Sequence, residues 1–369
     1  MSRETSLHSV HQGLGALFTD FAGWSMPVRY ASELAEHKAV REAAGLFDLS
    51  HMAEIHVRGA QAADVLDFAL VGNLTGVKPG RARYTMICDA DGGVLDDLVV
   101  YRLGDEEYLV VANAGNADVV AEALAERVAG FDAVVENRSA ETALIAVQGP
   151  RAVDVLAAVT DADLAALKYY ASVPATVKGH DVLLARTGYT GEDGFELFVP
   201  AAEAPALWQL LTEAGEAHGL VPCGLACRDT LRLEAGMPLY GNELTRELNP
   251  FAAGLGRVVK FEKPGDFVGR AALEELAKAD VPRVRVGLRG VGRRAPRHGY
   301  AVVAAEGGAL GSGNIGTVTS GALSPTLGYP IAMAYVDRAY AEPGTKLSVD
   351  IRGRIEPVEV VDLPFYSRA

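Results

Sequence analysis

The chain has 369 residues, of which 49% are hydrophobic and 22% are charged, and its formal net charge is -14. These values indicate a globular protein of two or three domains and argue against a general nucleic-acid binder, because phosphate contacts require a basic surface. No apolar run approaches the roughly 18 residues of a membrane helix, and the start Met1-Ser2-Arg3-Glu4-Thr5 lacks the basic and apolar segments of a signal peptide, so we expect a cytoplasmic protein without membrane contact.

Apolar residues recur at helical spacing in segments at 32–40, 114–128, 204–217 and 224–235. From about residue 281 the composition changes to short β-branched runs separated by Gly and Pro, as at 332–336 and 347–351. This change predicts a small all-β domain, either a barrel or a jelly-roll-like sandwich. We therefore divide the chain into a region at 1–280, made of two interleaved α+β domains, and a C-terminal β-barrel domain at 281–369.

One pattern occurs twice in the first region. Residues 53–66 and 143–156 both show alternating β-branched residues, then Gly, then apolar residues at helical spacing. A hairpin follows each copy, the first turning at 89–93 and the second at 188–194. The pattern predicts a duplicated β-α-β-β unit at about 50–220, in an antiparallel α+β fold with helices on one face of the sheet. Asp97 and Glu196 would then occupy comparable hairpin strands in the two halves.

These two hairpins place carboxylates inside apolar strands, in Leu95-Asp96-Asp97-Leu98 and in Phe195-Glu196-Leu197. A strand buries alternate residues, so one of Asp96 and Asp97 points inward, and a buried carboxylate is costly unless it is paired or used. An edge strand whose acids only accept ordinary hydrogen bonds is the alternative. By themselves, these residues indicate an α+β enzyme or a ligand-binding protein with buried acids.

Other motifs do not predict a site. The three cysteines, Cys88, Cys223 and Cys227, lack a second Cys or His pair and are interpreted as core residues rather than zinc ligands. The segment 311–316 fits the spacing G-x-G-x-x-G, but no helix start follows it to hold a pyrophosphate. His51 and His56 have no metal-ligand spacing, and we expect structural roles for them. No metal site is predicted.

Several motifs together resemble those of the glycine cleavage system T protein family, which are aminomethyltransferases, and the likeness runs along the whole chain. The segments that carry it are Phe21 to Tyr30, Gly45 to Met52, Gly92 to Asp97, Gly188 to Glu196, Cys227 to Gly236, Asp266 to Arg270, Gly316 to Pro325 and Pro364 to Tyr366.

The resemblance implies three domains around a central folate site. It implies an enzyme that transfers the one-carbon unit of an aminomethylated lipoyl group, carried by the H protein, to tetrahydrofolate. The products would be 5,10-methylenetetrahydrofolate and ammonia. Tetrahydrofolate would be the co-substrate and the lipoylated H protein the partner.

The resemblance also implies roles for individual residues. Asp97 would be the catalytic carboxylate, because loss of a nitrogen proton during ring closure requires an acceptor, and Glu196 would accept paired donors from the pterin. By strand alternation Asp96 would face the other way and serve structure. The remaining cofactor-binding and substrate-contacting positions are Tyr84, Tyr101, Asn113, Tyr169, Tyr189, Arg228 and Tyr366.

Two other functions remain open at this point. The chain could be another folate-dependent demethylase of the same superfamily, or a non-enzymatic folate-binding protein. Proteins of the second kind carry Cys in a K-G-C-Y-x-G-Q-E motif, whereas residues 187–192 hold no Cys here. The densest basic run, Arg283 to Arg297, could meet the glutamate tail of folate or an acidic H protein, or it could be a solvated strand face.

Overall fold

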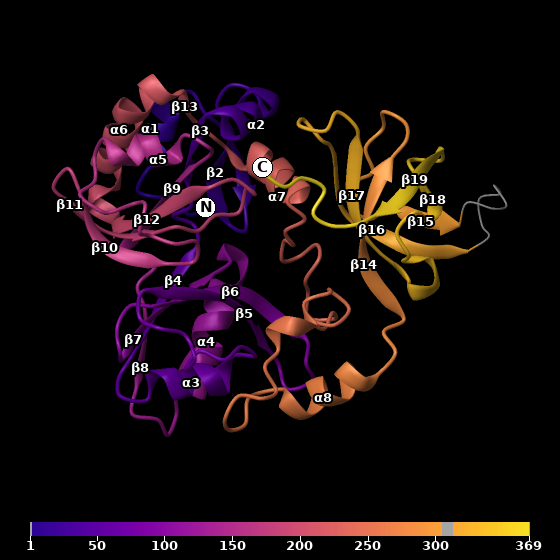
Figure 1. Cartoon of the computed structure of the whole chain (residues 1–369), viewed down its shortest axis with the longest axis horizontal. Coiled ribbons are helices and arrows are strands. Elements are labelled where there is room, and N and C mark those ends of the chain that lie inside the picture. The colour runs from indigo at the N-terminus through magenta and orange to yellow at the C-terminus, as the bar shows by residue number, and fades with distance from the viewer. Residues whose placement is uncertain (1, 305–312, 369) are drawn as a thin grey trace. The chain divides into compact units, whose positions relative to one another are not determined.

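A computed structural model describes residues 2–304 and 313–368, so Gly311 and Ser312 of the rejected dinucleotide pattern lie outside the described residues. The chain forms two compact units (Figure 1). Unit 1 comprises Met1–Ile87, Leu95–Arg228 and Glu262–Val268, and unit 2 comprises Cys88–Val94, Asp229–Phe261 and Gly269–Ala369. The sequence-based boundary between 280 and 281 stays a prediction.

The first half of unit 1 contains a five-stranded sheet in the order β5-β6-β7-β4-β8. Its neighbours whose register is described are antiparallel. Its elements, in chain order, are β4 (Ala53–Arg58), α3 (Ala62–Ala69), β5 (Arg81–Cys88), β6 (Val94–Arg102), β7 (Glu107–Ala112), η1 (Ala114–Asn116), α4 (Ala117–Arg127) and β8 (Val134–Asn137).

The second half contains a six-stranded sheet in the order β10-β11-β12-β9-β3-β13. Strand β3 (Ala44–Asp48) comes from before the first half, and it pairs with β13 in parallel and with β9 antiparallel. The other elements are β9 (Thr142–Gln148), α5 (Ala152–Ala157), β10 (Ser172–Val177), β11 (His180–Ala185), β12 (Gly194–Pro200), η2 (Ala201–Glu203), α6 (Ala204–Gly215), η3 (Glu216–His218) and β13 (Leu220–Pro222).

The two halves repeat one order of elements. The series β4-α3-β5-β6-β7-α4-β8 matches β9-α5-β10-β11-β12-α6-β13, and the sheet orders agree except that β3 lies between β9 and β13. The expected duplication is present and longer than predicted. The expected equivalence of Asp97 and Glu196 is wrong, because β6 corresponds to β11 and β7 to β12. The sequence analysis missed β10, which contains Pro174. It therefore matched the β5–β6 hairpin of the first half to β11–β12 of the second half, one strand too late.

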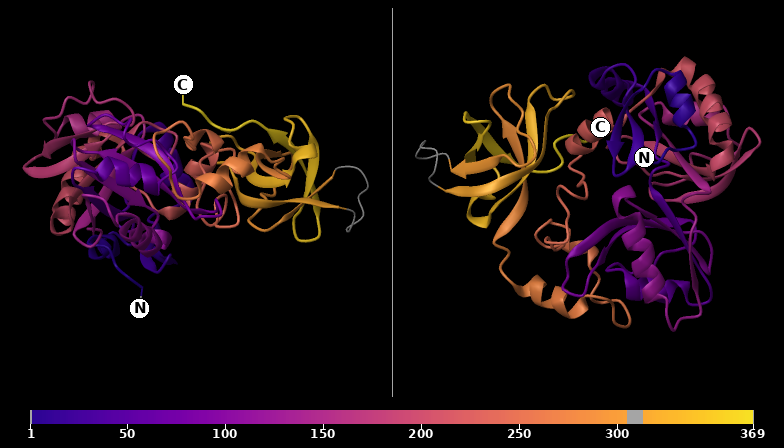
Figure 2. Two further views of the ribbon diagram at one scale, coloured as in Figure 1. Left: turned by 90° about the horizontal axis from the view of Figure 1, so that it is seen from below. Right: turned by 180° about the vertical axis from the view of Figure 1, so that it is seen from behind.

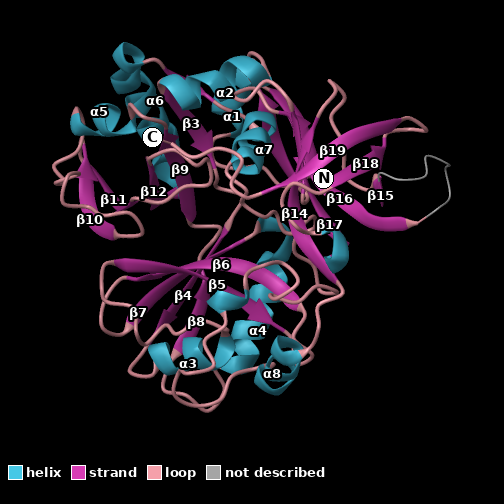
Figure 3. Ribbon diagram, turned by 45° about the vertical axis from the view of Figure 1, so that its right-hand side comes forward, coloured by secondary structure: helices cyan, strands magenta, loops and turns pink. Residues whose placement is uncertain are grey.

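Helices cover one face of each sheet (Figure 3). Residues of α5 and α6 form one core with alternate residues of β9 and β12, such as Ile145 and Leu197. Residues of α3 and α4 form a second core with alternate residues of β4 and β7, such as Ile55 and Val110. The other face of these strands is also buried, because consecutive residues of β7 and β9 are shielded from solvent. The opposite faces meet at Tyr101 of β6 and Phe198 of β12, whose ring centroids are 5.5 Å apart.

The N-terminal part of unit 1 comprises α1 (His8–Gly13), β1 (Leu17–Phe21), β2 (Trp24–Arg29) and α2 (Glu33–Glu42). Helix α2 begins as predicted after Ser32, whose side chain accepts a hydrogen bond from Ala35 N. A buried hydrogen bond joins this part to β3, because His11 Nε2 lies 2.9 Å from Asp48 Oδ2. Hydrogen bonds to Asp48 from Thr5 and His11, together with the positive charge of His11, lower the pKa of the Asp48 carboxyl against the effect of its burial.

Unit 2 contains a closed barrel in the order β14-β17-β16-β15-β18-β19, visible from two sides in Figure 2. All its described pairs are antiparallel, so the predicted α+β class with a C-terminal β-barrel is confirmed. The strands are β14 (Arg283–Gly290), β15 (Ala301–Ala304), β16 (Asn314–Leu323), β17 (Pro330–Asp337), β18 (Lys346–Asp350) and β19 (Ile355–Val361), with η4 (Gly256–Val258), α8 (Arg270–Lys278) and η5 (Arg338–Tyr340). Apolar residues such as Leu288 and Val336 fill the barrel.

Helix α7 (Leu225–Glu234) carries a motif whose later residues hold unit 2 together. Arg232 is 1% exposed and pairs with the buried Glu243 at 2.9 Å. Glu234 accepts hydrogen bonds from Ser324 and from both the backbone and the hydroxyl of Thr326. Removing one partner of such a buried pair leaves an uncompensated charge. These motif positions therefore serve folding.

Across the described residues, no helix is long and apolar enough to cross a membrane.

Candidate functional site

Asp97 lies on β6 with its carboxylate held from two sides. Tyr84 of the neighbouring β5 donates its hydroxyl to Asp97 Oδ2 at 3.1 Å, and Asn113 Nδ2 donates to Asp97 Oδ1 at 2.9 Å. Burial and the charge of Asp97 raise the pKa of Tyr84 well above its ordinary value, so this hydroxyl stays protonated and donates. Asp97 is half-buried. The structure therefore brings three of the sequence-predicted residues together around one carboxylate.

Asp96, the adjacent residue, is completely buried. Its carboxylate accepts hydrogen bonds from Asn113 N and Asn113 Nδ2, each at 2.9 Å, and from Asn116 Nδ2 at 2.7 Å. Asn116 precedes α4, which covers the outer face of the sheet, so the expected structural contacts of Asp96 are found. Asp96 and Asp97 are nevertheless connected, because Asn113 Nδ2 donates to both carboxylates.

Glu196 of β12 provides the second acid of the site. Tyr101 donates its hydroxyl to Glu196 Oε2 at 3.1 Å, and the Thr187 hydroxyl donates to the same oxygen. These bonds join the two sheets, since Tyr101 belongs to β6. Glu196 is half-buried, and no hydrogen bond to its Oε1 occurs within the described residues. One oxygen is thus fixed, and the other can accept a donor from a ligand.

Arg228 is the basic residue of this region. Its guanidinium lies over the Tyr189 ring, 4.8 Å from the centroid. It makes no ion pair with any described residue. Burial lowers its pKa, while the nearby Tyr189 and Glu196 raise it. A guanidinium stacked on an aromatic ring without a carboxylate partner can receive an anionic group.

His51 is a residue that the sequence analysis interpreted as structural. It is 3% exposed, and its Nδ1 has no hydrogen-bond partner in the described part of the chain. Burial and the positive charge of Arg228 lower the pKa of His51 to about 4, so the ring is neutral near neutral pH. Its position beside Arg228, far along the chain, could not be read from local spacing.

Tyr170 was also missed. It adopts the left-handed region with a φ of 57°, which is unfavourable for a residue with a Cβ. Its carbonyl accepts from Ala82 N and its amide donates to Arg186 O, so its backbone joins the two halves. Burial raises the pKa of its hydroxyl, and the nearby Tyr169, Glu196 and Asp97 raise it further. Neighbouring Tyr169, a sequence-predicted position, is 49% exposed and packs edge-on against Tyr170.

Tyr366 belongs to unit 2, whereas the other sequence-predicted site residues belong to unit 1. Its backbone amide donates to Glu234 O at 2.8 Å, which fixes the chain just after the barrel. The proposed contact of Tyr366 with substrate stays a prediction.

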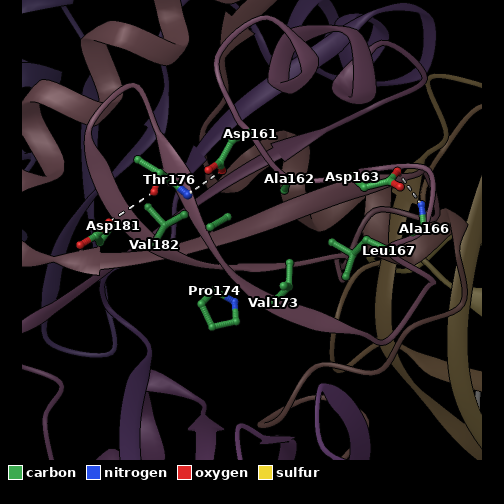
Figure 4. Close-up of a pocket in the computed structure, with 11 residues that line it drawn as sticks. Asp161, Ala162, Asp163, Ala166, Leu167, Val173, Pro174, Thr176, Asp181 and Val182 are labelled. Atoms are coloured by element: carbon green, nitrogen blue, oxygen red, sulfur yellow. Dashed lines mark hydrogen bonds between the residues drawn. The ribbon is translucent and has the colours of Figure 1, made fainter.

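A hollow of about 710 Å³ lies at the β10–β11 edge of the six-stranded sheet (Figure 4). None of the sequence-predicted site residues lines it. Its carboxylates are used locally: Asp161 accepts from Thr176 N, and Asp163 accepts from the backbone amides at 165 and 166. Within residues 2–304 and 313–368, no cluster of His, Cys, Asp or Glu could hold a metal ion. Cys88, Cys223 and Cys227 are buried, and no disulfide joins them.

The basic run on the barrel is partly paired within unit 2. Arg283 pairs with Asp337 at 2.7 Å, Arg289 with Glu359 at 2.6 Å, and Arg294 with Glu356 at 3.1 Å. The partners come from neighbouring strands or their ends. These pairs compensate three of the six arginines, whereas Arg285 and Arg297 donate to backbone carbonyl groups. The paired half of the run favours a solvated strand face among the three interpretations.

Comparisons with known proteins agree along the whole chain. Residues 7–263 match the family described as the GCVT N-terminal domain, and residues 283–367 match the glycine cleavage T-protein C-terminal barrel domain. The chain is similar to an aminomethyltransferase from Streptomyces coelicolor (67% identity) and to one from Saccharopolyspora erythraea (64%), each alignment covering 99% of this chain and 98% of the relative. It is also similar to the crystal structure of glycine cleavage system aminomethyltransferase T from Bartonella henselae, with a TM-score of 0.92 and 36% identity over 99% of this chain and 98% of that one.

Proposed function

The chain belongs to the glycine cleavage T-protein family and is an aminomethyltransferase, and from this premise we propose how its residues act. The one-carbon unit comes from an aminomethylated lipoyl group on the H protein and passes to tetrahydrofolate. The reaction yields 5,10-methylenetetrahydrofolate and ammonia and leaves the reduced lipoyl arm on its carrier. We propose the lipoyl group as the donor, the H protein as its carrier and folate as the acceptor.

The arrangement around Asp97 is the observation that carries the proposal. Its carboxylate is half-buried and oriented by Tyr84 and Asn113. Tetrahydrofolate supplies the nitrogen nucleophiles of the transfer, and closing the methylene bridge releases a proton from nitrogen. Asp97 would accept that proton and stabilise the positive charge that develops beside it. The hydroxyl and the amide that orient Asp97 are both neutral donors.

The fit to folate is supported by Glu196 and Arg228. The open Oε1 of Glu196 suits a donor edge such as that of an aminopyrimidine. The guanidinium of Arg228 and the ring of Tyr189 offer a cation and an aromatic surface in one place. The rings of Tyr84 and Tyr189 would provide the flat walls that a fused ring prefers, whereas Tyr101 is 1% exposed and acts through its hydroxyl on Glu196. The cytoplasmic location expected from the sequence stays a prediction.

The direct test uses the purified full chain with aminomethylated, lipoylated H protein and tetrahydrofolate. We expect one ammonia and one 5,10-methylenetetrahydrofolate for each aminomethyl group consumed. H protein without the aminomethyl group and H protein without lipoate are the controls. Failure of the complete mixture, with product instead from a methylated amine or sulfonium donor, would favour the folate-dependent demethylase. Binding of folate without turnover of any donor would favour a non-enzymatic folate-binding protein.

A further inference from the structure

One amide group holds two adjacent acids. Asn113 Nδ2 donates to Asp96 Oδ1 at 2.9 Å and to Asp97 Oδ1 at 2.9 Å, and it also lies 3.2 Å from the Asp97 carbonyl oxygen. An amide nitrogen has two hydrogens in one plane. Any rotation that improves one of these contacts must weaken another, so the orientation of Asp97 depends on what holds Asn113.

Asp96 is the group that holds it. The Asp96 carboxylate takes the backbone amide and the side-chain amide of Asn113 together, one on each oxygen. Asn116 Nδ2 binds the same oxygen as the Asn113 side chain, at 2.7 Å. Because Asp96 is fully buried, water does not compete for these bonds. The result is a fixed carboxylate at the connection between β7 and α4.

We propose that Asp96 is a positioning residue for Asp97, because it fixes the amide of Asn113 and that amide fixes the Asp97 carboxylate. The proposal rests on the proposed catalytic role of Asp97 and adds a second residue to it. Asp96 itself touches no substrate. Its role differs from the purely structural one that strand alternation indicated.

The groups that face Asp96 explain how pH would act on it. Asp97 faces it from the same strand, and the neutral amides of Asn113 and Asn116 face it from the connection before α4. Burial and the negative charge of Asp97 raise the pKa of Asp96 to about 7, against the opposing effect of the amide donors. Protonation near neutral pH would weaken the hold on Asn113. Activity should therefore follow the ionisation of a residue outside direct substrate contact.

The test compares Asp96→Asn with Asp105→Asn, a matched change at the exposed turn after β6. An asparagine places an NH2 donor where one of the two carboxylate oxygens stood, so it cannot accept one Asn113 donor at each position. We expect kcat to fall about tenfold while the folate Kd stays within about twofold. The kcat of the wild type should fall as pH drops below about 7, which gives the pH profile an acidic limb. Asp96→Asn should remove that limb. Asp105→Asn should match wild type.

The outcomes separate the two proposals. If wild type fails to use aminomethylated H protein, the proposed function is wrong. If wild type is active but Asp96→Asn keeps the wild-type kcat and pH profile, only the positioning role is wrong. If Asp96→Asn does not fold, Asn116→Ala replaces it, since it removes one donor to Asp96 and leaves Asn113 and Asp97 in place. That variant should move the limb to higher pH, and an unmoved limb would overturn the positioning role.

Discussion

The two halves of unit 1 share one order of elements, but their acids occupy different places in it. The first half carries Asp97 on β6, the second strand of its sheet order, and the second half carries Glu196 on β12, the third. Their surroundings also differ, because an amide and a tyrosine hold Asp97 whereas two hydroxyls hold Glu196. The two halves therefore share a scaffold, and Asp97 and Glu196 lie at non-equivalent positions in it.

The difference suggests a division of tasks. The first half holds two carboxylates on one amide, an arrangement suited to proton transfer because a neighbouring charge can tune the acid. The second half holds one carboxylate with an open oxygen near Arg228, an arrangement suited to binding. Tyr101 connects them, since it comes from the first half and donates to Glu196 of the second. Variants in each half should separate catalysis from binding.

The largest effect should come from Asp97→Asn. The amide is nearly isosteric with the carboxylate but cannot accept a proton, so kcat should fall by about 10² or more while folate binding is largely kept. Single-turnover transfer from aminomethylated H protein, with folate binding measured by calorimetry, gives both quantities. Turnover at the wild-type rate would remove Asp97 from the catalytic role and leave no division between the halves.

Stability should depend on pH in opposite ways at two buried groups. The raised pKa of Asp96, about 7, means that the folded state holds more protons than the unfolded state between about pH 4 and 7, so this group destabilises as pH rises. The pKa of His51 is lowered to about 4, so the folded state holds fewer protons than the unfolded state between about pH 4 and 6.5. This group therefore stabilises the fold as pH rises through that range. Each contribution has a limiting slope of about 1.4 kcal/mol per pH unit.

Urea unfolding of Asp96→Asn and His51→Gln at several pH values tests these signs. Relative to wild type, Asp96→Asn should gain stability as pH rises, and His51→Gln should lose it. The free energy of unfolding of the wild type at each pH is the common reference. The opposite contributions of Asp96 and His51 partly cancel in that wild-type dependence. Two variants with the same slope would show that the stated environments of these groups are wrong.

Glu196→Gln should affect binding more than chemistry. The lost hydrogen bonds to a charged acceptor are worth about 1.5–3 kcal/mol, so the folate Kd should rise about tenfold or more. The value of kcat at saturating folate should change less, because Glu196 lies on the half that binds. A fall in kcat as large as that of Asp97→Asn, at unchanged Kd, would contradict the division.

Tyr101→Phe should have a smaller effect that reports on the link between the halves. It removes one hydroxyl donor from Glu196 and leaves the Thr187 donor and the ring contact with Phe198. We expect a loss of about 1 kcal/mol in the free energy of unfolding and a severalfold rise in the folate Kd. Thermal unfolding with and without folate measures both. Combining it with Glu196→Gln should give less than the sum, because both changes affect the same bond.

The sequence predicted the parts of the site that lie in continuous motifs. Asp97 with Tyr84 and Asn113, and Glu196 with Tyr101, lie together in the structure. The sequence analysis missed two features that arise only when distant segments come together. His51 lies near Arg228, and Asn113 donates to both Asp96 and Asp97. The strand register was lost at β10, because Pro174 obscured the period of alternation. Local patterns specify elements, whereas partners of buried groups follow from tertiary packing.

The smallest effect should come from the barrel, outside both halves. Reversing Arg293 and Arg294 to Glu removes the ion pair between Arg294 and Glu356, whose side chains are 47% and 21% exposed. Exposed pairs contribute about 0–1 kcal/mol, so the melting temperature should fall by only a few degrees. Arg283 and Arg289 of the same run are also paired within the barrel, which reduces the net charge that the run offers to an acidic carrier. The KM for H protein and the folate Kd should both stay within about twofold at about 0.15 M salt.

A several-fold, salt-sensitive rise in the KM for H protein would restore the run as a docking surface. A rise in the folate Kd alone would assign the run to the glutamate tail. Either result would give the barrel a share of the binding that we assign to the second half of unit 1.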